Sequence, residues 1–222
     1  MTAKSGSLDF DQILSMIGRD DPVILDIGAN NGWHSSLFLK HFPRATLHAF
    51  EPDSRAACDF RRRIDDHRAT LHEVALSNGD GEVDFYMSDG HPPVEWGEYP
   101  DGFHMAGSIR RPKNALVDWP WLEFRRTQKV KLMKLDTWRR IHGIDHIDFI
   151  WADVQGAEGD LVDGGVETLA KTKYFYTEYS DREWYEGQVS FAVLAAKLPS
   201  FEVAEKFEMD ALFRNTNIVM PA

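Results

Sequence analysis

The stretch VILDIGANNGWHS, residues 23–35, begins as a continuous apolar run and ends in a turn that contains two glycines. Apolar runs of this length are typical of strands that are buried on both faces of a parallel sheet. Asp26 interrupts the run, and Gly28 and Gly32 allow a tight turn that a ligand can approach closely. Ligands of doubly wound sheets bind at the carboxyl ends of the strands, so this turn is the first candidate for a binding site.

Strand and helix patterns alternate along most of the chain around this stretch. We expect strands at 22–28, 45–52, 69–76, 130–136, 147–154 and 174–179, and an added antiparallel strand at 82–87. Helical spacing predicts helices near 10–17, 33–42, 56–64, 137–143, 158–165 and 188–198. Two apolar segments, 201–208 and 211–220, are expected to form a closing antiparallel hairpin. The order predicts an α/β fold with a doubly wound, mostly parallel sheet.

Residues 88–128, called the insertion below, break this alternation. The insertion contains five prolines and is rich in aromatic residues, and long irregular stretches inside a domain are usually functional or disordered. We expect a loop or lid that closes over the site. Its aromatic and arginine side chains could form a pocket for a sugar or a large apolar ring, or a dimer contact; they are Trp96, Tyr99, Phe103, Trp119, Trp121, Phe124, Arg110, Arg111, Arg125 and Arg126.

Composition limits the possible partners and location. The 222 residues carry a formal net charge of −11, which disfavours nucleic acid and anionic membranes as partners. The length fits one domain, expected to span residues 1–222. Cys58 is the only cysteine, which fits a reducing cytoplasm. The first residues do not read as a secretory signal, and no stretch approaches the ~20 apolar residues of a membrane-spanning helix.

Glu51 ends the second expected strand, 23 positions after Gly28. An acid about 20 residues beyond a glycine turn accepts hydrogen bonds from ribose hydroxyls, which indicates an adenosine-type ligand. The dinucleotide motif G-x-G-x-x-G is not met, because Asn30 and Trp33 stand at its second and third glycines. Asp26 adds negative charge beside the turn, which suits the ammonium group of S-adenosylmethionine (SAM) better than a pyrophosphate. Alternatively, Asp26 only caps the local turn.

A second stretch, DFIWADVQGAEGDLVDGG at 148–165, supplies further acids. Its strand ends at Asp153, and the following strand ends at Glu178. These two acids are therefore expected on the same rim as Asp26 and Glu51. An acidic rim tolerates a cationic sulfonium ligand and repels an anionic one.

In order and spacing, the segments LDIGANNGWHS, AFEPD, VALSNGDGEVDFY, KLDTW, DVQGAEGDLVDGG and YTEY resemble the FkbM family of SAM-dependent methyltransferases over about residues 23–180. The resemblance implies a class I, Rossmann-like fold and methyl transfer, mostly to hydroxyls of polyketide-type natural products and sugars. It implies that Asp26, Gly28, Asn30 and Gly32 contact the methionine part of SAM, that Glu51 binds the ribose and that Asp153 lies near the reacting centre. Trp151 departs from the family, which often has Lys there.

Two sets of site residues follow from these arguments. The expected cofactor-binding residues, for SAM and its product S-adenosylhomocysteine, are Asp26, Gly28, Ala29, Asn30, Asn31, Gly32, Glu51, Pro52, Asp53, Ala75, Leu76, Ser77 and Asp153. The catalytic candidates, each able to act as a base towards a hydroxyl, are Asp153, Glu178, His34 and His104. No metal site is expected, since the H-E-x-x-H motif is absent. A non-catalytic SAM-binding module and an NAD-type oxidoreductase remain as alternatives.

Overall fold

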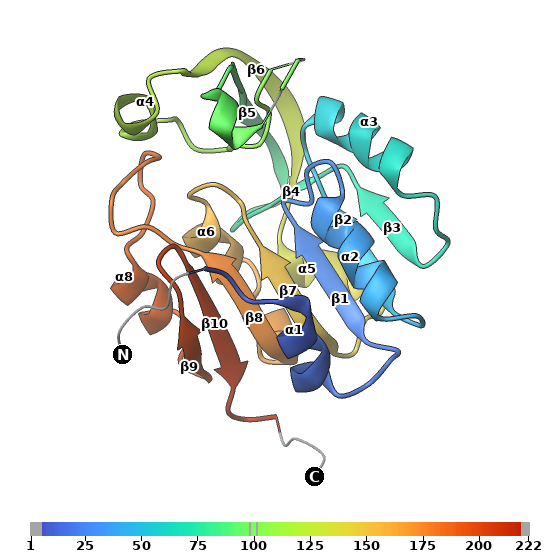
Figure 1. Cartoon of the computed structure of the whole chain (residues 1–222). Coiled ribbons are helices and arrows are strands. Elements are labelled where there is room, and N and C mark those ends of the chain that lie inside the picture. The colour runs from blue at the N-terminus through green and yellow to red at the C-terminus, as the bar shows by residue number, and fades with distance from the viewer. Residues whose placement is uncertain (1–5, 98, 101, 219–222) are drawn as a thin grey trace.

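The computed structural model describes residues 6–97, 99–100 and 102–218. These residues form a larger sheet with the strand order β3-β2-β1-β7-β8-β10-β9 and a smaller sheet with the order β4-β6-β5 (Figure 1). The strands of the larger sheet are β1 (Val23–Ile27), β2 (Thr46–Phe50), β3 (Ala69–His72), β7 (Ile147–Ala152), β8 (Thr172–Glu178), β9 (Phe201–Lys206) and β10 (Asp210–Asn215). β3, β2, β1, β7 and β8 are mutually parallel, whereas β10 is antiparallel to both of its neighbours. The predicted α/β class and the C-terminal hairpin are therefore confirmed, although residues 219 and 220 of the predicted hairpin lie outside the described residues.

Helices cover both faces of the larger sheet. They are α1 (Phe10–Ile17), α2 (Trp33–His41), α3 (Ser54–Arg63), α5 (Leu135–His142), α6 (Glu158–Asp163), α7 (Val166–Leu169) and α8 (Phe191–Ala196). Strand alternation divides the core between these faces. Leu25 packs in the cluster that holds α5 to α8, whereas Ile24 packs in the cluster that holds α1 and α2. Asp26 is two residues after Ile24 in the same strand, so both side chains point to the same face and the Asp26 carboxyl lies on the α2 face of the sheet.

The expected third strand at 69–76 is wrong as a single element. The chain leaves the larger sheet after His72 and then forms β4 (Ala75–Leu76), which pairs with β6 of the smaller sheet. Backbone groups mark the turn, because both Glu51 and Val74 donate their N–H to the carbonyl of His72 at 3.0 Å. An apolar pattern read along the chain cannot detect this change of sheet, since both strands are at least partly buried.

The insertion is more regular than the sequence predicts. β5 (Gly81–Gly90) and β6 (Leu122–Met133) form a long antiparallel pair that includes both ends of the insertion. Of the expected strand at 130–136, residues 130–133 are the end of β6, which lies in the smaller sheet rather than in the β/α series, and residues 135–136 already belong to α5. The prediction of an irregular segment is therefore wrong at 88–90 and 122–128. Residues 125–127 of β6 are exposed and polar, so this part of the strand shows no apolar alternation. The helical turns η1 (Val94–Trp96) and α4 (Ala115–Asp118) lie between the two strands.

The position of the smaller sheet decides where a ligand can bind. Figure 1 shows β5, β6 and α4 at the top of the molecule, over the larger sheet. β1 and β7 are neighbours in that sheet, and the chain leaves their carboxyl ends for α2 and α6 on opposite faces. A crevice forms at such a switch point, and the insertion lies over it. Among the described residues, no helix is both long and apolar enough to span a membrane.

Candidate active site

A cavity of about 300 Å³ lies where the loops after β1, β2 and β7 meet the insertion. Eleven of the predicted site residues line it: Gly28, Ala29, Asn30, Asn31, His34, Glu51, Pro52, Ala75, Leu76, His104 and Asp153. Five predicted site residues do not line it: Asp26, Gly32, Asp53, Ser77 and Glu178. The insertion contributes Tyr99, His104, Met105, Gly107 and Ile109 to the wall. The cavity is therefore closed on one side by the insertion, as a lid would close it.

Glycine is required at positions 28 and 32 of the first turn for two different reasons. Gly28 has a φ of +85°, and a Cβ built on it would lie 1.8 Å from the carbonyl oxygen of Asp153. Only glycine lets the loop after β1 pass so close to the loop after β7. Gly32 has a φ of +77°, and a Cβ there would lie 2.8 Å from the ring of Phe60. Gly32 therefore serves the packing of α3 against the turn rather than the cavity wall.

Glu51 is held in place by two backbone donors. The N–H of Asn30 donates to Oε2 at 2.8 Å, and the N–H of Asp53 donates to Oε1 at 2.7 Å. Burial raises the pKa of Glu51 to about 8, although these two hydrogen bonds lower it. Each carboxylate oxygen can accept two hydrogen bonds, so one site on each oxygen is left. Two adjacent hydroxyl groups match this pair of free sites.

Asp26 lies beneath the turn rather than in the cavity wall. It is fully buried, its Oδ2 accepts the Ser35 hydroxyl at 2.6 Å, and within the described part of the chain its Oδ1 has no hydrogen-bond partner. Burial raises its pKa. The bond from Ser35 in α2 fits the alternative that Asp26 fixes the local turn, and the free oxygen leaves it able to accept one more donor.

Apolar side chains form part of the cavity wall. Phe50, Val74, Leu76 and Phe85 contribute to this wall, and three of them come from elements that the change of sheet after His72 brings together. Ser77 was predicted here but lies behind the wall, where its N–H donates to the carbonyl of Met133 at 3.0 Å. Apolar side chains of this kind suit a flat aromatic ring.

The amide of Gln155 joins the carboxyls of Asp153 and Glu178 beside the cavity. Gln155 Nε2 donates to Asp153 Oδ1 at 2.6 Å and to Glu178 Oε2 at 3.0 Å. Asp153 lines the cavity, whereas Glu178 lies behind it. Burial raises the pKa of Glu178 well above its usual range, and the nearby carboxylates of Asp153 and Glu158 raise it further. Of the two predicted acids, Asp153 is therefore the one that can contact a ligand.

The two histidine candidates have different surroundings. The ring of His34 packs on buried Trp151, with ring centroids 4.3 Å apart. Trp151 thus acts as a packing residue in the sheet. His104 Nε2 lies 3.3 Å from Asp59 Oδ2, so His104 is already engaged by α3. Both rings line the cavity.

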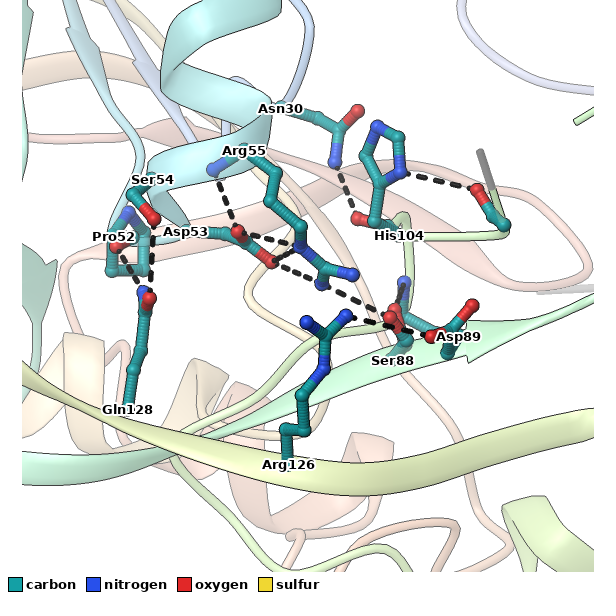
Figure 2. Close-up of polar contacts among 12 residues, drawn as sticks. Asn30, Pro52, Asp53, Ser54, Arg55, Ser88, Asp89, His104, Arg126 and Gln128 are labelled. Carbon is teal, nitrogen blue, oxygen red and sulfur yellow. Dashed lines mark hydrogen bonds and ion pairs between the residues drawn. The ribbon is translucent and has the colours of Figure 1, made fainter. Parts of the chain in front are cut away.

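Polar contacts join the insertion to the binding loops, as Figure 2 shows. Arg55 contacts both carboxylate oxygens of Asp53 and donates to the carbonyl of Ser88 at 3.0 Å. Gln128 Nε2 donates to the carbonyl of Pro52 at 2.8 Å. Asn30 Nδ2 donates to the carbonyl of His104 at 2.9 Å (Figure 2). Asp53, although outside the cavity wall, therefore fixes the loop that carries Glu51.

Most of the aromatic residues of the insertion do not reach the cavity. Phe103, Trp119, Trp121 and Phe124 pack with one another and with buried Ala106, Ala115 and Leu122. Among the six aromatic residues proposed for an acceptor pocket, only Tyr99 lines the cavity. The smaller sheet has few residues with which to build a core, so these side chains stabilise the insertion itself.

Several lining residues were missed by the sequence analysis. They include Trp33, Phe85, Met105, Gly107, Ile109 and Gln155. Gln155 stands inside the DVQGAE motif, so the sequence does carry a signal for this residue. Trp33 stands at the end of the glycine turn, inside the LDIGANNGWHS motif, whereas Met105, Gly107 and Ile109 carry no local signal because the fold of the insertion places them. Among the described residues, no group of three or more His, Cys, Asp and Glu side chains is arranged to hold a metal ion.

Comparisons with known proteins agree with this geometry. The model of the methyltransferase FkbM domain matches residues 26–211. The 2-O-methyltransferase NoeI of Sinorhizobium fredii is 45% identical over 213 residues, which cover 93% of this chain and 85% of NoeI. The antimetabolite synthetase AmbE of Pseudomonas aeruginosa is 29% identical over 184 residues, which cover 73% of this chain and 8% of AmbE.

Solved structures share the fold at low identity. A methyltransferase FkbM from Methylobacillus flagellatus has a TM-score of 0.54 and 13% identity, with coverage of 88% of this chain and 44% of the other. A fibrillarin pre-rRNA processing protein from Methanococcus jannaschii has a TM-score of 0.52 and 10% identity, with coverage of 90% and 69%. These two likenesses concern the fold alone. The family model and the 45% identical relative show that this chain belongs to the FkbM methyltransferase family and is a methyltransferase.

Proposed function

We propose that this methyltransferase uses SAM and transfers the methyl group to a hydroxyl oxygen of a small molecule or glycan. The observation that carries the proposal is Glu51, whose two oxygens each keep one free acceptor site at the edge of the cavity. A ribose offers two adjacent hydroxyls to such a pair. The printed name of the relative NoeI, a 2-O-methyltransferase, supports oxygen as the acceptor atom.

The other residues of the cavity fit the remaining parts of SAM. Phe50, Val74 and Phe85 offer an apolar wall to the adenine ring. The acids near the glycine turn suit the ammonium and sulfonium charges, and the buried Oδ1 of Asp26 has no partner within the described chain. Gly28 keeps this part of the wall free of side chains. When bound, SAM supplies an electrophilic methyl group, and S-adenosylhomocysteine remains as the product.

Asp153 is the residue we assign as the general base. It lines the cavity and is fixed by the amide of Gln155 at 2.6 Å. The Asp153 carboxylate would take the proton of the acceptor hydroxyl as its oxygen bonds to the methyl carbon, and the bond from that carbon to sulfur would break to leave S-adenosylhomocysteine. Orientation of the hydroxyl against that carbon accounts for much of the expected rate, and proton removal by a positioned base contributes typically 10²–10⁴-fold.

The acceptor is proposed to lie beside Trp33 and Met105. Both side chains line the cavity and both are exposed, Trp33 by 55% and Met105 by 42%. They therefore mark the mouth of the cavity, where a sugar ring or an apolar ring system can pack against an aromatic face. The net charge of −11 supports an acceptor that is not a nucleic acid.

The alternatives are weaker. An NAD-type oxidoreductase disagrees with the family to which the chain belongs. A non-catalytic SAM-binding module would not need the ordered pair of Asp153 and Glu178 beside the cavity. A homodimer formed through the insertion and a location in the cytoplasm stay predictions of the sequence.

Labelled methyl transfer tests the proposal. Purified protein is incubated with [methyl-³H]SAM and a panel of methyl glycosides and phenolic polyketides, and the product is analysed for an O-methyl ether. We expect Asp153→Asn to lower kcat at least a hundredfold while S-adenosylhomocysteine still binds by calorimetry. A thermal shift with NAD and none with SAM or S-adenosylhomocysteine would refute the cofactor assignment.

A further inference from the structure

The amide of Gln155 occupies an unusual position between two carboxyls. Its Nε2 donates to Asp153 Oδ1 and to Glu178 Oε2, so both amide hydrogens are used. Its Oε1 lies 2.9 Å from the hydroxyl of Tyr185. All polar atoms of this side chain therefore have partners, and the partners determine which way the amide faces. An amide turned by 180° would place its oxygen against two carboxyls.

Tyr185 connects this amide to the insertion. Tyr185 is 1% exposed, and its hydroxyl also lies 2.8 Å from the carbonyl of Ala106, so its single hydrogen is shared between this carbonyl and Gln155 Oε1. A second contact is made by Ser108, whose hydroxyl donates to the backbone carbonyl of Gln155 at 2.7 Å. Residues 106–108 of the insertion thus hold Gln155 at its backbone directly and at its amide through Tyr185.

The backbone of Gln155 lies in the left-handed region. Its φ is +52°, which is uncommon for a long side chain and is maintained only where the surroundings enforce it. The next residue, Gly156, has a φ of +92°, and a Cβ there would lie 2.8 Å from the Cβ of Tyr185. Close packing of Tyr185 against Gly156 therefore helps to enforce the turn. Such strain is typical of functional sites.

The amide of Gln155 lies among several acidic side chains. Four acids, Asp153, Glu158, Glu178 and Asp210, influence one another here, and burial with mutual repulsion raises the pKa of Glu178 well above its usual range. Glu178 therefore binds a proton more tightly than an exposed glutamate does. An amide N–H favours an acceptor oxygen that carries no proton. The short contact to Asp153 Oδ1 fixes that carboxylate beside the cavity.

We propose that Gln155 is a positioning residue for methyl transfer, which holds the carboxylate of Asp153 towards the acceptor, and that Tyr185 fixes the amide of Gln155 in the orientation this requires. The inference rests on the proposed function, because it assigns Asp153 as the base. It adds that the insertion, through Ala106 and Ser108, sets the geometry of the base as well as covering the cavity.

Two variants test the role in the full-length chain. Tyr185→Phe removes only the hydroxyl, and Gln155→Asn keeps an amide and a residue that tolerates positive φ but is one methylene shorter. Tyr179→Phe is the matched control, since its buried hydroxyl donates to the carbonyl of Phe207 at 2.7 Å and makes no contact with Gln155. Folding is checked by thermal unfolding, and S-adenosylhomocysteine affinity by calorimetry.

The first readout is the titration of the Asp153–Glu178 pair, followed by NMR with ¹³C-labelled carboxyls and assigned with Asp153→Asn. We expect the first deprotonation of the pair to move up by about one pH unit in Gln155→Asn and by less in Tyr185→Phe, with no change in Tyr179→Phe. An identical titration in wild type and both test variants would overturn the positioning role. This readout needs no acceptor, so it is independent of the proposed function.

The second readout is methyl transfer to the acceptor identified with the wild-type protein. We expect kcat to fall about five- to tenfold in Tyr185→Phe, with an unchanged KM for SAM and with the acid limb of the pH profile moved to higher pH. Equal kcat values in Tyr185→Phe and Tyr179→Phe would count against the proposal. If the wild-type protein itself transfers no methyl group to any acceptor, the proposed function fails, and the titration still decides whether Gln155 orients the pair.

Discussion

The carboxyl of Glu51 links cofactor binding to pH. Burial raises its pKa to about 8 in the free protein, so below this pH it mainly carries a proton. Two ribose hydroxyls must donate to a carboxylate, and binding therefore favours proton loss. We expect the affinity for S-adenosylhomocysteine to rise as the pH increases from 6 towards about 8, by less than tenfold per pH unit, and to level off above.

Glu51→Gln separates this effect from other titrations near the site. Burial raises the pKa of Glu158 to about 7, and this group remains in the variant. Calorimetry from pH 6 to 9 should show a smaller pH slope for Glu51→Gln than for wild type, together with affinity about tenfold weaker at pH 8. Equal slopes in the two proteins would show that Glu51 does not titrate on binding.

Trp33 is the residue we expect to select the acceptor. It is the first residue of α2, lines the mouth of the cavity and is 55% exposed. Trp33→Ala should raise the KM for the acceptor about tenfold, the effect of one lost stacking contact, and should leave S-adenosylhomocysteine binding unchanged. Trp96→Ala is the control, because Trp96 is 50% exposed but lies outside the cavity wall. Similar KM values for the two variants would contradict this role.

At the scale of elements, Gly28 joins the ends of β1 and β7. A Cβ at this position would lie 1.8 Å from the carbonyl oxygen of Asp153, so either strand end must move. We expect Gly28→Ala to lower the free energy of unfolding by about 3 kcal/mol or more and to abolish cofactor binding. Urea unfolding measures the first effect, and calorimetry the second.

Gly143 supplies the matched control for this substitution. It follows α5 with a φ of +64°, and a Cβ there meets nothing within 4 Å. In Gly143→Ala the free energy of unfolding should therefore fall only by the cost of the left-handed backbone, about 1 kcal/mol. This variant should bind S-adenosylhomocysteine normally. Comparable losses of stability in Gly28→Ala and Gly143→Ala would mean that contact between the loops after β1 and β7 is not the cause.

At the scale of the whole molecule, Arg55 holds the smaller sheet against the larger one. It bridges the buried carboxylate of Asp53 and the carbonyl of Ser88 (Figure 2). Arg55→Ala leaves Asp53 without its charged partner, so we expect the free energy of unfolding to fall by about 2 kcal/mol. Because the N–H of Asp53 also orients Glu51, cofactor affinity should fall as well.

An exposed ion pair provides the comparison for Arg55. The side chains of Arg44 and Asp20 are 67% and 53% exposed, and such pairs contribute about 0–1 kcal/mol. Arg44→Ala should change neither stability, measured by urea unfolding, nor S-adenosylhomocysteine affinity by a comparable amount. If limited proteolysis cuts the insertion equally fast in Arg55→Ala and Arg44→Ala, Arg55 does not hold the insertion in place.

The sequence by itself determined the elements of the larger sheet and part of the site. Apolar runs and helical spacing are local properties, so they predicted β1, β2, β7 and β8 and the helices between them. Positive φ is also a local requirement, which glycine reveals at Gly28. The interval between Gly28 and Glu51 predicted that both lie at one site, because parallel strands end at the same edge of a sheet.

The tertiary structure alone decided which side chains face the cavity. Asp26 and Glu178 were predicted in the rim but lie behind the wall, because the face of a strand and the depth of its end depend on neighbouring elements. The bridge from Tyr185 through Gln155 to Asp153 joins segments 30 residues apart, and the insertion reaches Gln155 from 47 residues away. No periodic pattern encodes such contacts, since they form only when the smaller sheet packs over the larger one.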